Sequence, residues 1–473
     1  MGTKTSKAKL WLGLGAYVMS GAAAAGAGQA GDGTKSDRLS TTAGLERFAG
    51  APRGDRAIDW SSVAGDSVTA RVAQRILLAA TEGGEGGEGG EGGEGGGMPS
   101  SYKLSSTDAD AFNYDAKAQL RAYADLAFTN YSAAQADAMA LQTAVTALLA
   151  TPSEETLATA RFAWLNARPA YLQTEVFRFY DGPIDVDPAS GEDGPEGRIN
   201  AWPMNEAHVD YVDGQPDAGL INDASQEISR DIILANDQVA DEADVTTGWH
   251  AIEFLLWGQD LDDYGPGARP ASDYVAGQGN NDRRRLYLET VTELLVGDLG
   301  GLAEQWAPNK TGNYRESFLA LDQREALGRI MNGMAQLAGF EMASERLAVA
   351  LDSGDQEDEH SCFSDNTRND HIYDLRGIRN VYFGQYGAAN GAGIDQLVAE
   401  LDPTLNQQII AALNRAEAAL AAIDQPFDRV LASAPGSLPR AEAEAAVTAL
   451  QDLAALLKDA GGKLGVLVIV AGL

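Results

Sequence analysis

The stretch from residue 115 to residue 149, DAKAQLRAYADLAFTNYSAAQADAMALQTAVTALL, decides the fold class of this chain. Its apolar side chains recur mostly at steps of three and four residues, as at Leu120, Tyr123 and Leu126. This spacing places them on one face of a helix. The stretch therefore predicts a long amphipathic helix that buries one face.

The residues that follow predict a second helix packed against the first. Thr151 and Pro152 interrupt the pattern, and Ser153 is a suitable N-cap because its hydroxyl can accept a hydrogen bond from the first turn. We expect this helix to run through Trp164 towards Phe179 and to form an antiparallel hairpin with its predecessor. Similar helical patterns follow at 283–306, 313–337, 338–352, 404–423 and 440–459.

Alternating, strand-like patterns are almost absent, so the sequence predicts an all-α protein built of helix bundles. The roughly 370 residues from 101 to 473 exceed what one hydrophobic core usually organises. We therefore expect two packed helical-bundle subdomains, at about 101–265 and 280–473, with the boundary in the loop between Asp260 and Asn281.

The first thirty residues predict export. Three lysines without an acid precede an apolar run that starts at Leu10, and small residues continue to Ala30. This order is typical of a secretory signal peptide in residues 1–30, whereas a membrane anchor needs about 20 uninterrupted apolar residues. We expect a periplasmic mature protein with no transmembrane segment after signal cleavage.

Residues 31–100 end in a run of Glu-Gly-Gly triplets at 82–97. Glycine at two of every three positions has high backbone entropy and no side chain to bury, so this segment is interpreted as a flexible N-terminal extension.

The chain is strongly acidic, with 69 Asp and Glu residues against 35 Lys and Arg, a formal charge of -34. Such a charge repels nucleic acid and anionic membrane surfaces, so nucleic acid is excluded as a partner. The acidity is otherwise explained by solubility. The one cysteine, Cys362, cannot form an internal disulfide, so the fold must be stabilised by its core.

The strongest functional signal is the segment GWHAIEFLLWG at 248–258. His250 and Glu253 are three residues apart, so on a helix they share one face and can hold one metal ion. Histidine is scarce in this chain, which has only four. The alternative is that the two side chains form a structural hydrogen bond at the edge of a packed helix.

Extended through Asp260, this segment resembles the imelysin family, which is also catalogued as the M75 peptidases and includes iron-regulated bacterial proteins. The resemblance covers roughly residues 110–470, and the block EHSCFSD at 359–365 is similar to the iron-regulated protein A branch in particular. It implies two helical bundles with a site between them. Further similar blocks lie at 164–179, 200–203, 210–211, 345–346 and 356–367.

The candidate metal ligands are His250 and Glu253, with Glu175 as the expected third ligand and His360 and Asp365 in reserve. Nitrogen and carboxylate donors together suit Fe(II), Zn(II) or Mn(II). Glu175 is predicted in an apolar helix, where an unpaired carboxylate is costly and needs a cation.

Each ligand also has a structural alternative. Glu175 could form a helix ion pair with Arg178. The acidic loop at 353–370, which holds the two reserve ligands, could be a solvated turn. His208 and His371 are interpreted as surface or capping residues.

The resemblance implies an exported protein that binds iron or a similar divalent metal, with Fe(II) ahead of Zn(II), and acts in bacterial iron uptake or handling. Its partners would be the metal ion or a metal-bearing ligand and envelope iron-uptake proteins. One alternative is an M75-type metallopeptidase, although the usual His-Glu-x-x-His order is absent because Phe254 follows Glu253. A second is a metal-free periplasmic ligand-binding module whose groove is lined by Trp202, Tyr211, Trp249 and Trp257.

Overall fold

The computed structural model describes residues 112–262, 264–387 and 389–471. The predicted signal peptide and the predicted extension at 31–100 lie outside these residues. In the described part the regular elements are helices, apart from one antiparallel pair, β1 (Gln385–Tyr386) and β2 (Ala389–Asn390). This confirms the expected all-α fold. No helix in this part is long and apolar enough to cross a membrane.

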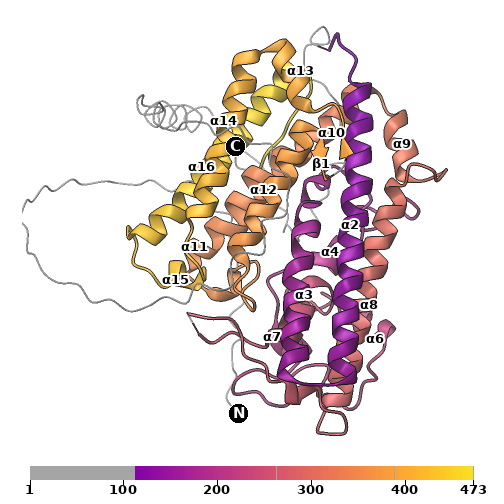
Figure 1. The fold of residues 1–473 in the computed structure, drawn as a ribbon, viewed down its shortest axis with the longest axis vertical. Helices are drawn as coiled ribbons and strands as arrows, with labels where there is room; N and C mark the ends of the chain where they lie inside the picture. Colours follow the sequence, from indigo (N-terminus) through magenta and orange to yellow (C-terminus); the bar gives the residue numbers. More distant parts are fainter. Residues whose placement is uncertain (1–111, 263, 388, 472–473) are drawn as a thin grey trace, which may run out of the picture. The chain divides into compact units, whose positions relative to one another are not determined.

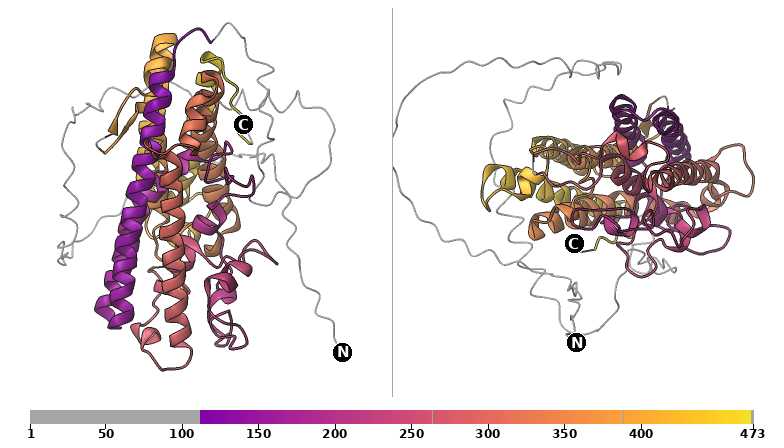
Figure 2. Two further views of the ribbon diagram at one scale, coloured as in Figure 1. Left: turned by 90° about the vertical axis from the view of Figure 1, so that its right-hand side faces the viewer. Right: turned by 90° about the horizontal axis from the view of Figure 1, so that it is seen from below.

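The long helix α2 (Lys117–Ala150) packs along α3 (Glu154–Leu172) and α8 (Asn281–Trp306), as Figures 1 and 2 show. Its predicted apolar face is buried in the core. The hydroxyl of Ser153 caps α3 by accepting a hydrogen bond from the backbone of Thr156, as predicted. The hairpin of α2 and α3 is therefore confirmed.

The helix α3 ends earlier than predicted. A short 3-10 turn, η3 (Glu175–Phe177), follows it in place of a helix running to Phe179. The backbone N–H of Thr174 donates to the Tyr171 carbonyl at 2.6 Å, a three-residue spacing that tightens the last turn. Phe179 then adopts a left-handed φ of 68°, which cannot continue a helix. The predicted end was therefore wrong, and Glu175 lies in the turn.

A second set of helices packs around α16 (Leu438–Lys463). It contains α10 (Gln323–Gln336), η5 (Leu337–Ala348) and α14 (Pro403–Ala422), which all contact α16. The helix α12 (Thr367–Phe383) packs against α14 and also against α3, so it joins the two sets (Figure 1).

The boundaries of this second set differ from the prediction in three places. The helix predicted at 313–337 is two helices, because Asp322 caps a new start. The segment predicted as a separate helix at 338–352 continues α10 through η5, which has π-helical geometry. The predicted loop at 353–370 ends sooner, since α12 begins at Thr367.

Shorter elements complete the described chain. The helix α7 (Gly248–Trp257) contacts α3, α4 and α8. The helix α8 lies after the predicted subdomain boundary, but it packs on α2, which lies before that boundary. The division into subdomains at 101–265 and 280–473 stays a prediction. The remaining elements are α4 (Glu196–Asn200), α5 (Glu206–Val209), α6 (Arg230–Ala235), η4 (Ala271–Tyr274), α9 (Tyr314–Ala320), α11 (Val349–Ser353), η6 (Gln356–Asp358), α13 (Ile394–Leu401) and α15 (Asp428–Leu431).

Candidate functional site

The helix α7 is buried along its whole length, so its polar residues must be satisfied by other parts of the protein. It starts at Gly248, whose φ is +80°. A Cβ at this position would lie 2.4 Å from the Ile199 carbonyl oxygen and 2.7 Å from that of Arg198. Only glycine fits both the backbone angle and this close approach to α4. The glycine of the motif thus sets the position of the histidine two residues later.

The two polar residues of the motif contact each other. His250 Nδ1 and Glu253 Oε2 are 2.9 Å apart, and both side chains are buried. The second ring nitrogen, His250 Nε2, is buried and has no hydrogen-bond partner. Buried polar atoms rarely lack a partner, so this nitrogen is a candidate ligand atom.

Glu253 is held from its other side by the loop before α12. Its Oε1 accepts hydrogen bonds from the Ser364 backbone N–H at 3.0 Å and from the Ser364 hydroxyl at 2.6 Å. Burial raises the pKa of Glu253 to about 8, although the bonds from Ser364 and the charge of Arg168 act in the opposite direction. The motif is therefore tied to the downstream sequence block.

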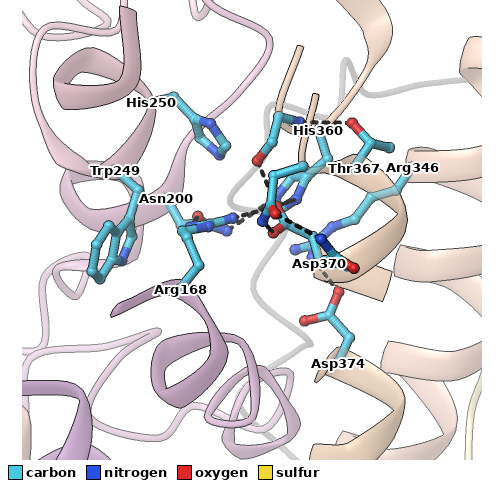
Figure 3. Close-up of polar contacts among 12 residues, drawn as sticks. Arg168, Asn200, Trp249, His250, Arg346, His360, Thr367, Asp370 and Asp374 are labelled. Carbon is cyan, nitrogen blue, oxygen red and sulfur yellow. Dashed lines mark hydrogen bonds and ion pairs between the residues drawn. The ribbon is translucent and has the colours of Figure 1, made fainter. Parts of the chain in front are cut away.

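A second imidazole comes from that block. The ring of His360 lies 4.9 Å from that of His250, centroid to centroid, at an angle of 70° (Figure 3). His360 Nδ1 is 2.8 Å from Asp370 Oδ2, and its Nε2 accepts a hydrogen bond from the Asn200 amide at 3.2 Å. Each histidine thus has a carboxyl group at its Nδ1.

A buried polar network supports His360 (Figure 3). Arg168 donates to Asp370 at 2.7 Å and to the Asn200 amide oxygen at 2.7 Å. Asp370 also accepts hydrogen bonds from the Ser361 hydroxyl at 2.5 Å and the Asn366 amide at 2.6 Å. Arg168 therefore balances the charge of Asp370 and joins α3, α4 and α12 around the histidine.

Both histidines are neutral in this environment. Burial is the largest cause that lowers the pKa of His250 and of His360 well below the ordinary value. The neighbouring guanidinium group of Arg168 lowers both pKa values further, and Arg346 also acts on each ring. Neutral imidazole is the form that binds metals.

Glu175 lies in a different network. It forms the ion pair with Arg178 that the sequence analysis gave as the alternative to metal binding. Its carboxylate contacts Arg178 at 3.0 Å and Arg346 at 2.6 Å. Burial alone would raise its pKa, but the two arginines lower the pKa to about 2. Arg346 also binds Glu341 at 2.8 Å and Asp374 at 2.9 Å. The charge of Glu175 is thus already compensated by the protein.

Asp365 lies in yet another cluster. Among the described residues, one group of three His, Cys, Asp or Glu side chains offers ligand atoms all within 4.8 Å of one another, and it is Asp260, Asp365 and Asp428. The structure therefore brings His250, Glu253 and His360 together and places Glu175 and Asp365 with other partners.

The sequence reasoning missed four residues of the histidine site as functional candidates. Arg168 and Asn200 lie in the blocks that carried the family resemblance, so that resemblance was the available signal. Ser364 lies in the downstream block, and Asp370 was missed because the first turn of its helix was predicted as part of the loop at 353–370.

The other histidines and the aromatic residues can also be placed. His371 is fully buried and neither ring nitrogen has a hydrogen-bond partner, so its assignment as a surface or capping residue was wrong. His208 is partly exposed and its Nε2 lies 3.1 Å from the Asn236 carbonyl oxygen. Trp249 and Trp257 pack in the core, whereas Tyr211 lines a surface pocket.

Comparisons with known proteins agree with this architecture. The family model described as imelysin, Peptidase M75, matches residues 127–457. Iron-regulated protein A of Synechococcus elongatus is 26% identical over 332 residues, which cover 68% of this chain and 80% of the relative.

Two solved structures share the fold. An iron-regulated protein A precursor from Parabacteroides distasonis has a TM-score of 0.58 at 19% identity, covering 76% of this chain and 96% of the other. An imelysin-like protein from Psychrobacter arcticum has a TM-score of 0.52 at 17% identity, covering 76% and 99%.

Proposed function

Because this chain belongs to the imelysin family, we propose that it binds iron or a similar divalent metal through His250 and His360 and acts in iron uptake or handling. The observation that carries the proposal is the buried, unpartnered Nε2 of His250 beside a second neutral imidazole. A metal ion is a partner that accepts lone pairs from nitrogen, so it would satisfy this atom.

The carboxyl groups act as orienting partners in this proposal. Metal-binding histidines commonly direct the nitrogen that faces away from the metal to a carboxylate, which fixes the ring. Glu253 and Asp370 occupy that position at the Nδ1 atoms of His250 and His360. The Nε2 atoms are then the ligand atoms, and Asn200 would give up its hydrogen bond to His360. This differs from the sequence expectation, in which Glu253 was a direct ligand.

Iron is favoured over other metals by the names of relatives. The similar proteins from Synechococcus elongatus and Parabacteroides distasonis are both described as iron-regulated. Imidazole donors suit Zn(II) as well as Fe(II), so zinc is the competing ion. When bound, the metal ion would act as a Lewis acid, so a small molecule carried by the protein could bind to it through an oxygen or nitrogen atom.

Export also belongs to the proposal. The amino-terminal pattern of residues 1–30 is typical of a signal peptide. The Parabacteroides distasonis relative is described as a precursor, a term used for proteins that lose an N-terminal segment. A periplasmic protein of this kind would meet its iron source and its envelope partners outside the cytoplasm.

The test is metal content after dialysis with Fe(II) under nitrogen, and separately with Zn(II), measured by inductively coupled plasma mass spectrometry. We expect close to one ion per chain, and loss of that ion in the His250→Ala and His360→Ala variants. His208→Ala is the matched control, because His208 lies outside the site, and it should retain the metal. Equal metal in the parent and in both site variants, with folding verified by circular dichroism, would overturn the proposal.

A peptide-cleavage assay on the loaded protein then separates a carrier from a metallopeptidase. Glu253 is already held by His250 at one carboxyl oxygen and by Ser364 at the other, so neither oxygen is free to take a proton from a bound water. We therefore expect no cleavage above that of the His250→Ala variant. Metal-dependent cleavage would support the peptidase alternative.

A further inference from the structure

Three aspartates from distant segments meet next to the end of α7. Asp260 follows the glycine that ends this helix, Asp365 lies in the loop before α12, and Asp428 is the first residue of α15. Each offers a carboxylate oxygen within 4.8 Å of the other two. Asp260 and Asp428 are buried and Asp365 is partly buried. Like charges at this spacing repel each other unless something neutralises them.

A fourth carboxyl group faces this cluster from outside it. Glu359 is fully buried, and its carboxyl group lies within hydrogen-bonding reach of Asp428. Its Oε2 accepts a hydrogen bond from the Thr367 hydroxyl at 3.1 Å, whereas its Oε1 is buried without a partner. The buried Oδ2 of Asp260 also lacks a hydrogen-bond donor. Unpaired carboxylate oxygens in a buried position are costly, so they point to a cation.

The electrostatics agree with this geometry. The strongest charge interactions of Asp365 are with Asp428 and Asp260, and all of them raise its pKa. With burial as the largest cause, the pKa of Asp365 is raised to about 8 and that of Asp260 to about 7. Both carboxyl groups therefore keep their protons to a higher pH than exposed aspartates do, which shows how unfavourable a second negative charge is at this position.

One member of the cluster, Asp260, lies at a surface pocket. Asp260 lines a surface pocket of about 690 Å³ together with Asp262, Gln259 and Tyr211. A hydrated ion is much smaller than this pocket, so it can approach Asp260 without unfolding of the protein.

We propose that Asp260, Asp365 and Asp428, with Glu359 behind them, form a second cation site, for a hard divalent ion of the Ca²⁺ class. The donors are all oxygen, which Ca²⁺ prefers, and the site lacks the imidazole nitrogens that favour Fe(II) or Zn(II). Ca²⁺ also accepts the flexible, irregular geometry of ligands from three separate segments.

Such an ion would hold together the parts that carry the histidine site. The loop that supplies Asp365 also supplies His360 and the Ser364 contact to Glu253, and Asp260 follows the helix of His250. The bound cation would fix the position of the loop against α7. It would thus stabilise the histidine site without contacting the metal held there.

The experiment is isothermal titration of the EDTA-treated, dialysed full chain with CaCl₂ at fixed pH and 0.15 M KCl, followed by MgCl₂ for comparison. We expect one Ca²⁺ site per chain and weaker binding of Mg²⁺. The Asp365→Asn, Asp428→Asn double variant should lower Ca²⁺ affinity at least tenfold. Asp213→Asn, which removes a carboxylate of the same pocket outside the cluster, should bind like the parent.

Two further readouts keep the result interpretable. The double variant should unfold in EDTA at the same temperature as the parent or higher, because it removes repulsion, and should lose the Ca²⁺-dependent rise in melting temperature. His250→Ala should keep Ca²⁺ binding, so failure of the histidine proposal and failure of this one are distinguishable. Absence of Ca²⁺ binding, or equal binding in the folded double variant, would overturn the proposal.

Discussion

Two clusters of buried carboxyl groups in this protein solve the same electrostatic problem in opposite ways. Around Glu175 the guanidinium groups of Arg178 and Arg346 compensate the charge, and the pKa of Glu175 falls to about 2. Around Asp365 the neighbours are other carboxyl groups, and its pKa rises to about 8. Acidity by itself therefore does not identify a cation site. The informative feature is whether the charged neighbours of a buried carboxyl group have the opposite sign, as around Glu175, or the same sign, as around Asp365.

The largest effect is expected when the compensated cluster loses its central cation. Arg346→Met should destabilise the protein by about 3–5 kcal/mol, because Glu175, Glu341 and Asp374 would remain buried without their shared partner. Urea unfolding followed by circular dichroism measures this loss. A cost below about 1 kcal/mol would mean that water screens the charges around Glu175. Compensation by arginine would then not distinguish this cluster from the one around Asp365.

A matched pair of amide substitutions sharpens the contrast. Glu175→Gln should lower the free energy of unfolding by about 1–3 kcal/mol, because it removes a charged acceptor from two buried arginines. Asp365→Asn, measured in EDTA, should leave stability unchanged or raise it, since it removes repulsion from Asp428 and Asp260. The same change in both variants would contradict the contrast.

A third way to bury an ionisable group is to keep it neutral, and the fully buried His371 is an example. Burial, followed by the charge of Arg346, lowers the pKa of His371 to about 3. The unfolded chain therefore binds one more proton than the folded protein between about pH 6.5 and pH 3, and stability falls as the pH falls through that window. The contribution of this residue is a slope of at most about 1.4 kcal/mol per pH unit.

His371→Gln should flatten the pH dependence of unfolding by that single-proton slope. The measurement is a series of urea titrations between pH 4 and pH 6.5 on parent and variant, because a general loss of stability shifts the curve without changing its slope. Identical slopes would indicate that His371 is protonated in the folded protein.

The sequence predicted the parts of this fold that depend on local patterns. The period of apolar residues in α2 and the capping serine of α3 were sufficient to predict the hairpin. The end of α3 was not predictable from apolar spacing, because the buried apolar residues Val176 and Phe177 continue the pattern into the 3-10 turn that follows the helix. The helix α12 was missed because its first turns carry the polar residues that serve the site, such as Asp370, which resemble a loop in composition.

The site was predicted only where it depends on local spacing in the sequence. The spacing of His250 and Glu253 indicates that they share a helix face, and their 2.9 Å contact agrees with it. The separation of Glu175 from Asp365 follows from tertiary contacts with Arg346 and Asp428, which no local pattern encodes. The role of Gly248 became clear only from the carbonyl groups of α4 that approach it.

X-ray absorption spectroscopy at the metal edge tests the proposal that His250 and His360 bind the metal most directly, because it reports the donor atoms. Protein loaded with one equivalent of Zn(II) or Fe(II) should give two imidazole donors per ion, with Zn–N distances of about 2.0–2.1 Å. The His360→Ala variant should lose one of them. An all-oxygen shell in the parent would contradict the account and would place the metal among Asp260, Asp365 and Asp428.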